Sequence, residues 1–431
     1  MRTLKFKLEV ITPMFIAGAD QHQPEIRPPS IRGALRFWFR AMMGGVLGGD
    51  WRKVKEKEDE IFGSTDVASR IKIRKEDENL NIFDPKGKKK SLKGKEGVVY
   101  LAFLYVKWDR QQKCFIWNHS FIEPGSTFSI ELVSPPSTLS ILIDSFWLFL
   151  HFGGLGARTR RGFGSLSVKN LPMLSEEGVN FDIPDNPSDL CKYFKKNLNT
   201  IQQHFAKLVF HASDILNTTK KAIPGFSCFS AWKALFLTNN NWNRWENVLN
   251  DVGQFLRKFR NQSNNMRRPT PDYNNVVSYY LPQRSGNSWV INHNRIKNWD
   301  LINDAFGLPI QFRSSSRSRK VSTYNQKFDI AALLGWEVKN KEFDRRASPL
   351  IIRPLFLRQK DRFVTIFLLF KAQFLPVQAK EHLKPIGKWP PKVPKPGLKS
   401  IKPASLDVLI KFLDKAKGTF RNVGELPEMG K

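Results

Sequence analysis

The expected fold depends most on one stretch, Phe152–Leu166, which reads FGGLGARTRRGFGSL. It lies between a segment with the apolar pattern of a buried helix and one with the pattern of a strand. Glycine tolerates positive φ and lets other atoms approach the backbone closely, so this run forms either a tight turn or a cradle for a ligand. A plain turn needs one or two glycines, whereas this stretch has five, beside three arginines. The candidate binding residues here are Gly153, Gly154, Gly156, Arg158, Arg160 and Arg161.

The glycine-rich loop does not match the motifs that bind free nucleotides. A P-loop needs G-x-x-x-x-G-K-[ST], which is absent, and a dinucleotide fingerprint needs a strand before it and a helix after it. Here a helix leads into the loop and a strand leaves it. The arginine guanidiniums are forked donors that suit phosphodiesters, so we favour a nucleic-acid backbone as the ligand. A tight turn with solvated arginines is the alternative.

Outward from the loop, the first part of the chain alternates strand and helix patterns. TLKFKLEVIT (residues 3–12) alternates apolar and polar side chains, the signature of a half-buried strand. The following segments predict a helix over 28–45, strands over 69–75, 97–108 and 126–134, a helix over 137–152 and a strand over 164–171. The underlying order is β-α-β-β-α-β with one extra strand or extension, which is the ferredoxin-like arrangement with two helices on one face of an antiparallel sheet.

The second part of the chain has a more helical pattern from about residue 176 and then returns to strands. It predicts helices over 225–237 and 243–261, a hairpin of strands 348–358 and 361–376, and a helix over 405–416. The Lys/Pro-rich segment 380–403 has seven lysines and six prolines, a density that keeps a linker extended. We therefore expect an α+β protein with two domains, 1–175 with the glycine-rich loop 153–164, and 176–431 with a helical insertion.

The charge of the chain points to a polyanionic partner. Its 431 residues include 70 Lys and Arg against 39 Asp and Glu, a formal net charge of +31. Nucleic acid is the favoured partner, because basic residues recur along the whole chain and a peripheral membrane protein concentrates them in one helix or tail. The longest apolar run, residues 141–152, contains Asp144 and is too short to span a bilayer. We expect a cytoplasmic protein that binds no membrane.

Two further basic segments are candidates for RNA contact. In residues 28–45, Ser30 is the candidate helix N-cap, whose unpaired amides would form an anion site beside Arg27 and Arg32. Arg32 and Arg36 recur on one helix face, which predicts either phosphate contact or a solvated arginine stripe. The third segment, QFRSSSRSRKVS (residues 311–322), suits a loop that clamps a sugar-phosphate backbone, and a disordered basic loop is the alternative. Its candidate residues are Arg313, Arg317 and Arg319.

Candidates for catalysis are few. His151 borders the glycine-rich loop and could act as an acid or base, although its apolar surroundings favour a packed histidine. Asp20 lies in the loop between the first strand and the first helix, where a lone carboxylate is usually solvated. The histidines form no H-E-x-x-H pattern, and the sequence predicts neither a metal site nor a cofactor.

Several motifs, in this order, resemble one protein family: ITPMFIAGAD, RPPSIRGALRFWFRA, IFGS and GGLGARTRRGFGSL. The chain is similar to the RAMP superfamily of CRISPR proteins, in particular to first subunits of the Cmr (type III-B) effector complex. These motifs cover roughly residues 1–170, and AFGLPI and RRASPLIIRPL resemble the second half of the same subunits.

The resemblance implies tandem ferredoxin-like (RRM-like) domains and a glycine-rich loop before the last strand of the first one. It also implies a non-catalytic role: holding guide RNA (crRNA) and complementary target RNA in a particle with other RAMP subunits. In that family a different RAMP protein cuts the target, with an aspartate in the loop after its first strand. Because Asp20 falls in a similar loop, a metal-assisted RNA endonuclease is the alternative function.

Overall fold

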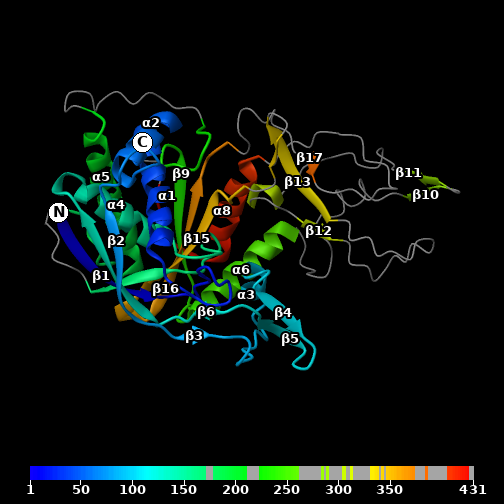
Figure 1. Ribbon diagram of the computed structural model, residues 1–431. Helices are drawn as coiled ribbons and strands as arrows, with labels where there is room; N and C mark the ends of the chain where they lie inside the picture. The colour runs from blue at the N-terminus through cyan, green and yellow to red at the C-terminus, as the bar shows by residue number, and fades with distance from the viewer. Residues whose placement is uncertain are drawn as a thin grey trace. The chain divides into compact units, whose positions relative to one another are not determined.

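The computed structural model divides into two compact units (Figure 1). Unit 1 comprises Met1–Phe255, Leu350–Ala372 and Leu413–Lys431, and unit 2 comprises Leu256–Pro349 and Gln373–Phe412. The structure describes residues 1–170, 178–210, 223–261, 283–285, 288–290, 303–306, 311–313, 331–338, 341–343, 346–373, 384–386 and 405–426. The expected domain boundary near residue 175 falls inside unit 1, and independent domains over 1–175 and 176–431 stay a prediction.

The first sheet of unit 1 is antiparallel, with the strand order β2-β7-β1-β8. Its strands are β1 (Arg2–Val10), β2 (Lys72–Asn79), β7 (Thr127–Ser134) and β8 (Leu166–Asn170). The alternation predicted for residues 3–12 is confirmed, because Phe6, Leu8 and Val10 are buried. The strands predicted over 69–75, 126–134 and 164–171 correspond to β2, β7 and β8.

Helices of unit 1 bury this sheet's apolar side chains. They are α1 (Pro28–Val46), α2 (Trp51–Phe62), α4 (Pro136–Phe152) and α5 (Leu190–Lys207). The Phe146 ring of α4 packs on Phe6 of β1 with centroids 4.7 Å apart. The Trp38 ring of α1 stacks on Phe152 of α4 with centroids 6.0 Å apart. The helices predicted over 28–45 and 137–152 are thereby confirmed, and together they hold the glycine-rich loop that follows Phe152.

The second sheet of unit 1 repeats the strand order of the first. Its strands are β9 (Trp232–Thr238), β15 (Leu350–Leu357), β16 (Arg362–Phe370) and β18 (Arg421–Leu426), in the antiparallel order β15-β16-β9-β18. Helix α6 (Trp245–Asn261) follows β9, and α8 (Asp407–Thr419) precedes β18. In both sheets the strands that come first and third along the chain are the central pair. The fold is therefore mixed α+β with antiparallel sheets, and the predicted hairpin and the helices over 243–261 and 405–416 are confirmed.

Two predicted elements are wrong. Residues 225–237 were expected to be helical, but 232–238 form the central strand β9, whose side chains are almost all buried. A short apolar run fits a buried strand as well as a helix, so periodicity alone does not separate them. The strand expected over 97–108 begins instead with helix α3 (Glu96–Leu101). The amide of Gly97 donates to Asn250 Oδ1 on α6 at 2.9 Å, a contact with a residue far away in the sequence.

Smaller strands complete both units. In unit 1, β3 (Ile82–Phe83) pairs with β6 (Phe121–Ile122), and β4 (Val106–Asp109) forms a hairpin with β5 (Cys114–Trp117). The described part of unit 2 contains short strands as well as helical residues, and the expected helical insertion stays a prediction. These strands are β10 (Gln283–Ser285), β11 (Ser288–Val290), β12 (Gln311–Arg313), β13 (Ala331–Val338), β14 (Lys341–Phe343) and β17 (Lys384–Ile386). Over the described ranges, no helix has both the length and the apolar character that crossing a bilayer requires.

Candidate nucleic-acid interface

Backbone hydrogen bonds join the glycine-rich loop to the segment that follows β1. The amide of Ala157 donates to the Phe15 carbonyl at 2.7 Å, and the amide of Gly164 donates to the Pro13 carbonyl at 2.9 Å. The loop also closes on itself, since the Leu155 amide donates to the Gly164 carbonyl at 2.9 Å. These hydrogen bonds therefore fix the backbone conformation of the loop.

Contacts within the protein account for the glycines. Gly156 has φ +93°, and a Cβ there would lie 2.3 Å from the Phe15 carbonyl oxygen. A Cβ on Gly153 would lie 2.4 Å from Nε1 of Trp38. A larger residue at either position would force the loop away from its neighbours. The glycine content by itself therefore does not require a ligand, and any argument for binding has to come from the arginines and from the space beside them.

The three loop arginines are half-buried, not fully solvated. Arg158 donates a hydrogen bond to the Phe103 carbonyl, and its Cζ lies 5.9 Å from the centroid of the Tyr105 ring. The Cζ of Arg160 lies 5.0 Å from the centroid of the Phe37 ring. Burial lowers the pKa of Arg160 to about 10, so its guanidinium stays charged at neutral pH. The backbone of Arg161 bridges to Ile352 of β15.

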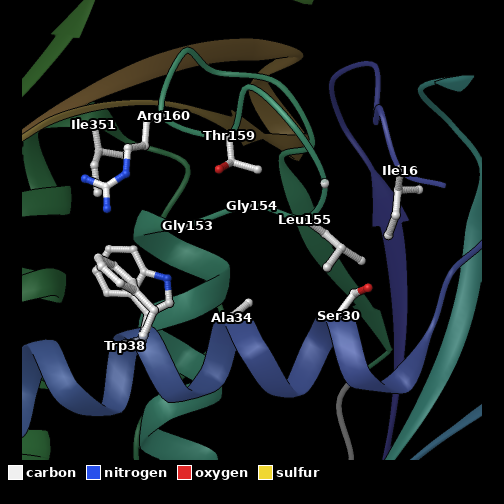
Figure 2. Close-up of a pocket in the computed structure, with 12 residues that line it drawn as sticks. Ile16, Ser30, Ala34, Trp38, Gly153, Gly154, Leu155, Thr159, Arg160 and Ile351 are labelled. Carbon is white, nitrogen blue, oxygen red and sulfur yellow. The ribbon is translucent and has the colours of Figure 1, made fainter. Parts of the chain in front are cut away.

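A cavity of about 380 Å³ lies between helix α1 and the glycine-rich loop. Figure 2 shows the Arg160 side chain on one side of this space and Trp38 of α1 on the other. The hydroxyl-bearing residues Ser30 and Thr159 also line it. The lining residues are Ile16, Ser30, Ala34, Phe37, Trp38, Gly153, Gly154, Leu155, Gly156, Thr159, Arg160 and Ile351. The structure thus brings the predicted residues Ser30, Gly153, Gly154, Gly156 and Arg160 to one site.

The arginines along α1 point their donors at protein groups. Arg32 donates to the carbonyls of Phe62 and Ile71 at 3.2 and 3.1 Å. Arg36 and Arg40 donate to the same oxygen of Glu58, at 2.5 and 2.6 Å. Glu58 lies on α2 with a side chain that is only 2% exposed. The alternative of a solvated stripe is therefore wrong, and RNA contact by Arg32 and Arg36 stays a prediction.

The anion site predicted at the start of α1 has no free backbone donors. The helix begins at Pro28, and Arg27 occupies the N-cap position instead of Ser30. The two prolines carry no N–H group. The amides of Ser30 and Ile31 both donate to the Arg27 carbonyl, at 3.0 and 3.3 Å. The prediction of Ser30 as N-cap is wrong, and the exposed Arg27 side chain remains at the rim of this helix end.

The two residues considered for catalysis have different surroundings. His151 is 2% exposed, donates from Nδ1 to the Trp147 carbonyl at 2.8 Å, and lies 3.0 Å from the Tyr193 hydroxyl through Nε2. Burial lowers its pKa to about 3, so it is a packed neutral histidine. Asp20 is exposed, and its carboxylate accepts the His22 amide at 2.8 Å. In the described part of the chain, no group of three or more His, Cys, Asp or Glu residues is arranged to hold a metal ion.

The third basic segment, residues 311–322, belongs to unit 2. Arg313 ends strand β12 in unit 2. Arg317 and Arg319 lie outside the described residues. The prediction of a backbone clamp in residues 311–322 therefore stays a prediction.

Comparison with known proteins assigns the family. The sequence model of the RAMP superfamily matches residues 7–167, which include α1 and the whole glycine-rich loop. The CRISPR system Cmr subunit Cmr1-2 of Pyrococcus furiosus is 37% identical over 177 residues, or 38% of this chain and 95% of Cmr1-2. The chain belongs to the RAMP superfamily, in the Cmr1 family.

Two solved structures share the fold of this RAMP protein. The crystal structure of Cmr1 from Pyrococcus furiosus in its apo form has a TM-score of 0.55 at 19% identity, and the match covers 98% of this chain and 99% of that one. A chain of the type III-B Cmr-beta complex bound to cognate target RNA and AMPPnP has a TM-score of 0.50 at 12% identity, with 96% and 99% covered. At these identities the similarity concerns the fold.

One residue of this RAMP protein that supports the site was missed by the sequence analysis. Arg353 of β15 is 1% exposed, and its guanidinium donates to the carbonyls of Leu150 and Leu166, the latter at 2.5 Å. These two residues flank the glycine-rich loop, so Arg353 fixes where the loop leaves α4 and enters β8. The available signal was an arginine in the middle of the apolar run LIIRPLFL, where an unpaired charge is costly to bury.

Proposed function

We propose that this RAMP protein is a non-catalytic RNA-binding subunit of a type III-B CRISPR effector complex. The observation that carries the proposal is the glycine-rich loop, which lies in the segment matched by the RAMP family and places the Arg160 guanidinium beside an open cavity. Arg158 lies on the same loop, and the chain as a whole carries a net charge of +31. Guanidinium groups at fixed positions on a strongly basic protein suit the phosphates and bases of RNA.

The proposed architecture is a tandem pair of ferredoxin-like domains. Each sheet of unit 1 is built from strands in the chain order β-α-β-β-α-β, with the first and third strands in the centre. That order is the one by which ferredoxin-like folds are recognised. Unit 2 is then an insertion into the second domain, since its segments lie between β9 and β15 and between β16 and β18 in the chain.

The proposed partners are guide RNA, complementary target RNA and other RAMP subunits of a Cmr complex in the cytoplasm. The similarity to Cmr proteins supports these partners. Cmr1-2 is by its name a Cmr subunit, and the Cmr-beta structure that shares the fold contains cognate target RNA. Holding these RNAs would be this subunit's contribution to antiviral defence.

The surroundings of the two candidate catalytic residues support a non-catalytic role. His151 is buried and held neutral, so it has no access to a substrate proton. Asp20 stands at an exposed turn, and among the described contacts its carboxylate accepts the backbone amide of His22 but meets no second carboxylate and no imidazole ring. A metal-assisted endonuclease that uses Asp20 would have to recruit further ligands from the substrate or from another subunit.

Salt-dependent RNA binding by the purified protein tests the proposal. Affinity for a fluorescein-labelled single-stranded RNA should fall steeply between about 50 and 200 mM salt. Each neutralised phosphate contributes about −0.7 to the slope of log affinity against log salt, so four contacts give about −3. No binding, or a slope near zero, would contradict the proposed function.

Incubation of end-labelled RNA with the protein and Mg²⁺ or Mn²⁺ tests the absence of catalysis. The RNA should stay intact. Metal-dependent cleavage that Asp20→Asn abolishes, and that Asp66→Asn at another exposed turn leaves unchanged, would establish the endonuclease instead.

A further inference from the structure

The cavity between α1 and the glycine-rich loop has mixed polar and apolar walls. The rings of Phe37 and Trp38 and the aliphatic side chains of Ile16, Leu155 and Ile351 supply the apolar part. The volume of about 380 Å³ lies in the range of sites for small organic groups. Gly156 at its edge is exposed, so the cavity is reached from solvent. A space of this size and character suits one flat aromatic ligand and not a duplex.

The cavity holds two hydroxyls, of Ser30 and Thr159, that can donate or accept hydrogen bonds, and two groups that only donate. The latter are the Arg160 guanidinium and the Trp38 indole, which lie on opposite sides of the space in Figure 2. Both groups donate hydrogen bonds and accept none. Arg160 is also the only charged residue among those that line the cavity. A ligand that hydrogen-bonds to Arg160 and Trp38 must therefore present acceptor atoms, and the apolar part of the wall disfavours one that is ionic throughout.

We propose that this cavity binds a single unpaired nucleobase of RNA, with its carbonyl oxygens directed at Arg160 and Trp38. This inference rests on the proposed RNA-binding function and adds a base-specific subsite to it. Unpaired bases are recognised by stacking on aromatic rings and guanidinium planes and by hydrogen bonds to their exposed edges. Uracil and guanine present carbonyl acceptors, whereas adenine presents ring-nitrogen acceptors next to an amino group that would oppose one of the two donors. A uracil-containing strand is therefore preferred over an adenine-containing one.

Leucine substitutions at two adjacent residues of α1 distinguish base binding in the cavity from general affinity for RNA. Ala34 is half-buried and lines the cavity, so Ala34→Leu fills the space without a change in charge. Gly33 is exposed, and a Cβ on it would meet no atom within 4 Å. Gly33→Leu therefore adds the same side chain outside the cavity and is the matched control.

The measurement compares oligouridylate and oligoadenylate strands of about twelve nucleotides, within the span of single-strand binding sites, by fluorescence anisotropy. We expect the unmodified protein and Gly33→Leu to bind oligouridylate about tenfold more tightly, the scale of a good base contact. Ala34→Leu should reduce this ratio to about one and leave the salt slope unchanged. An unchanged ratio in folded Ala34→Leu, or no uridine preference in the unmodified protein, would overturn the base subsite while salt-dependent RNA binding still supported the proposed function. Loss of all RNA binding in the unmodified protein would instead refute the proposed function.

Photo-crosslinking of the unmodified protein keeps the proposal falsifiable if Ala34→Leu does not fold. An oligouridylate that contains 4-thiouridine should crosslink to the tryptic peptide Phe37–Arg40, FWFR, which holds both aromatic rings of the cavity. Crosslinks confined to peptides that do not line the cavity would overturn the proposal.

Discussion

The clearest test of how the glycine-rich loop is held is the substitution Thr12→Val. Thr12 is fully buried, its hydroxyl donates to the Gly162 carbonyl at 2.8 Å, and it accepts the Ser165 amide at 3.0 Å. Valine keeps the shape and removes both hydrogen bonds, so two buried backbone groups lose their partner. Each such loss costs about 1–3 kcal/mol. The Ser165 hydroxyl lies 3.4 Å from the Gly162 carbonyl and replaces part of one bond, which brings the expected total to about 2–3 kcal/mol.

Hydrogen exchange measured by mass spectrometry on a peptide that covers residues 153–166 reports this loss. A cost of about 2 kcal/mol corresponds to roughly thirtyfold faster exchange of the loop amides, since 1.36 kcal/mol is a factor of ten. Thr12→Ser is the control, because it keeps the hydroxyl and removes one methyl group, worth about 1 kcal/mol. The reasoning is refuted if the valine variant exchanges as slowly as the unmodified protein, or more slowly than the serine variant.

Two further predictions concern contacts between helices. Glu58→Gln should lower the free energy of unfolding, measured in urea, by about 2 kcal/mol. This is less than the loss of a fully buried ion pair costs, because one of the two α1 arginines is 41% exposed. The control Glu56→Gln changes an exposed side chain and should have no effect; equal unfolding midpoints for Glu58→Gln and the unmodified protein would contradict the prediction. The hydrogen bond to Asp144 at 2.8 Å raises the pKa of His204 above its usual 6.5, and burial raises the pKa of Asp144. Charged His204 therefore stabilises the folded state most below about pH 6.5, and the contribution disappears as pH rises through the raised folded-state pKa. The stability difference between the unmodified protein and His204→Asn should shrink over that window, and a constant difference would show that the pair does not titrate.

Sequence patterns predicted the elements whose period or length is distinctive. The alternation in residues 3–12 marks a strand with one buried face, and the apolar run in 137–152 is long enough to mark a buried helix; both elements formed as expected. The helix prediction over 225–237 was wrong because β9 is buried on both faces, and such a strand lacks the alternation of apolar and polar residues. The strand prediction over 97–108 was wrong at its start, where the helix contacts Asn250, about 150 residues away.

The sequence predicted where the candidate site lies, but not which protein groups its arginines contact. The sequence located the glycine-rich loop and its arginines, and the structure adds the cavity beside them. The hydrogen-bond partners of the arginines could not be predicted. The carboxylate of Glu58 and the carbonyls that accept hydrogen bonds from Arg32 and Arg353 belong to other elements. An arginine stripe on a helix has the same pattern whether its donors face a ligand or a neighbouring helix.

The half-burial of the loop arginines changes how the loop would bind RNA. Solvated arginines would have to be ordered on binding, at a cost in side-chain entropy. Arg160 already lies over the Phe37 ring, and Arg158 is already hydrogen-bonded to Phe103 and lies over the Tyr105 ring. Their guanidiniums therefore occupy defined positions before RNA arrives, and little further ordering is needed. Because the same side chains pack against the protein, alanine at these positions would also remove folding contacts, so the base preference of Ala34→Leu isolates the RNA contact better than loss of the arginines.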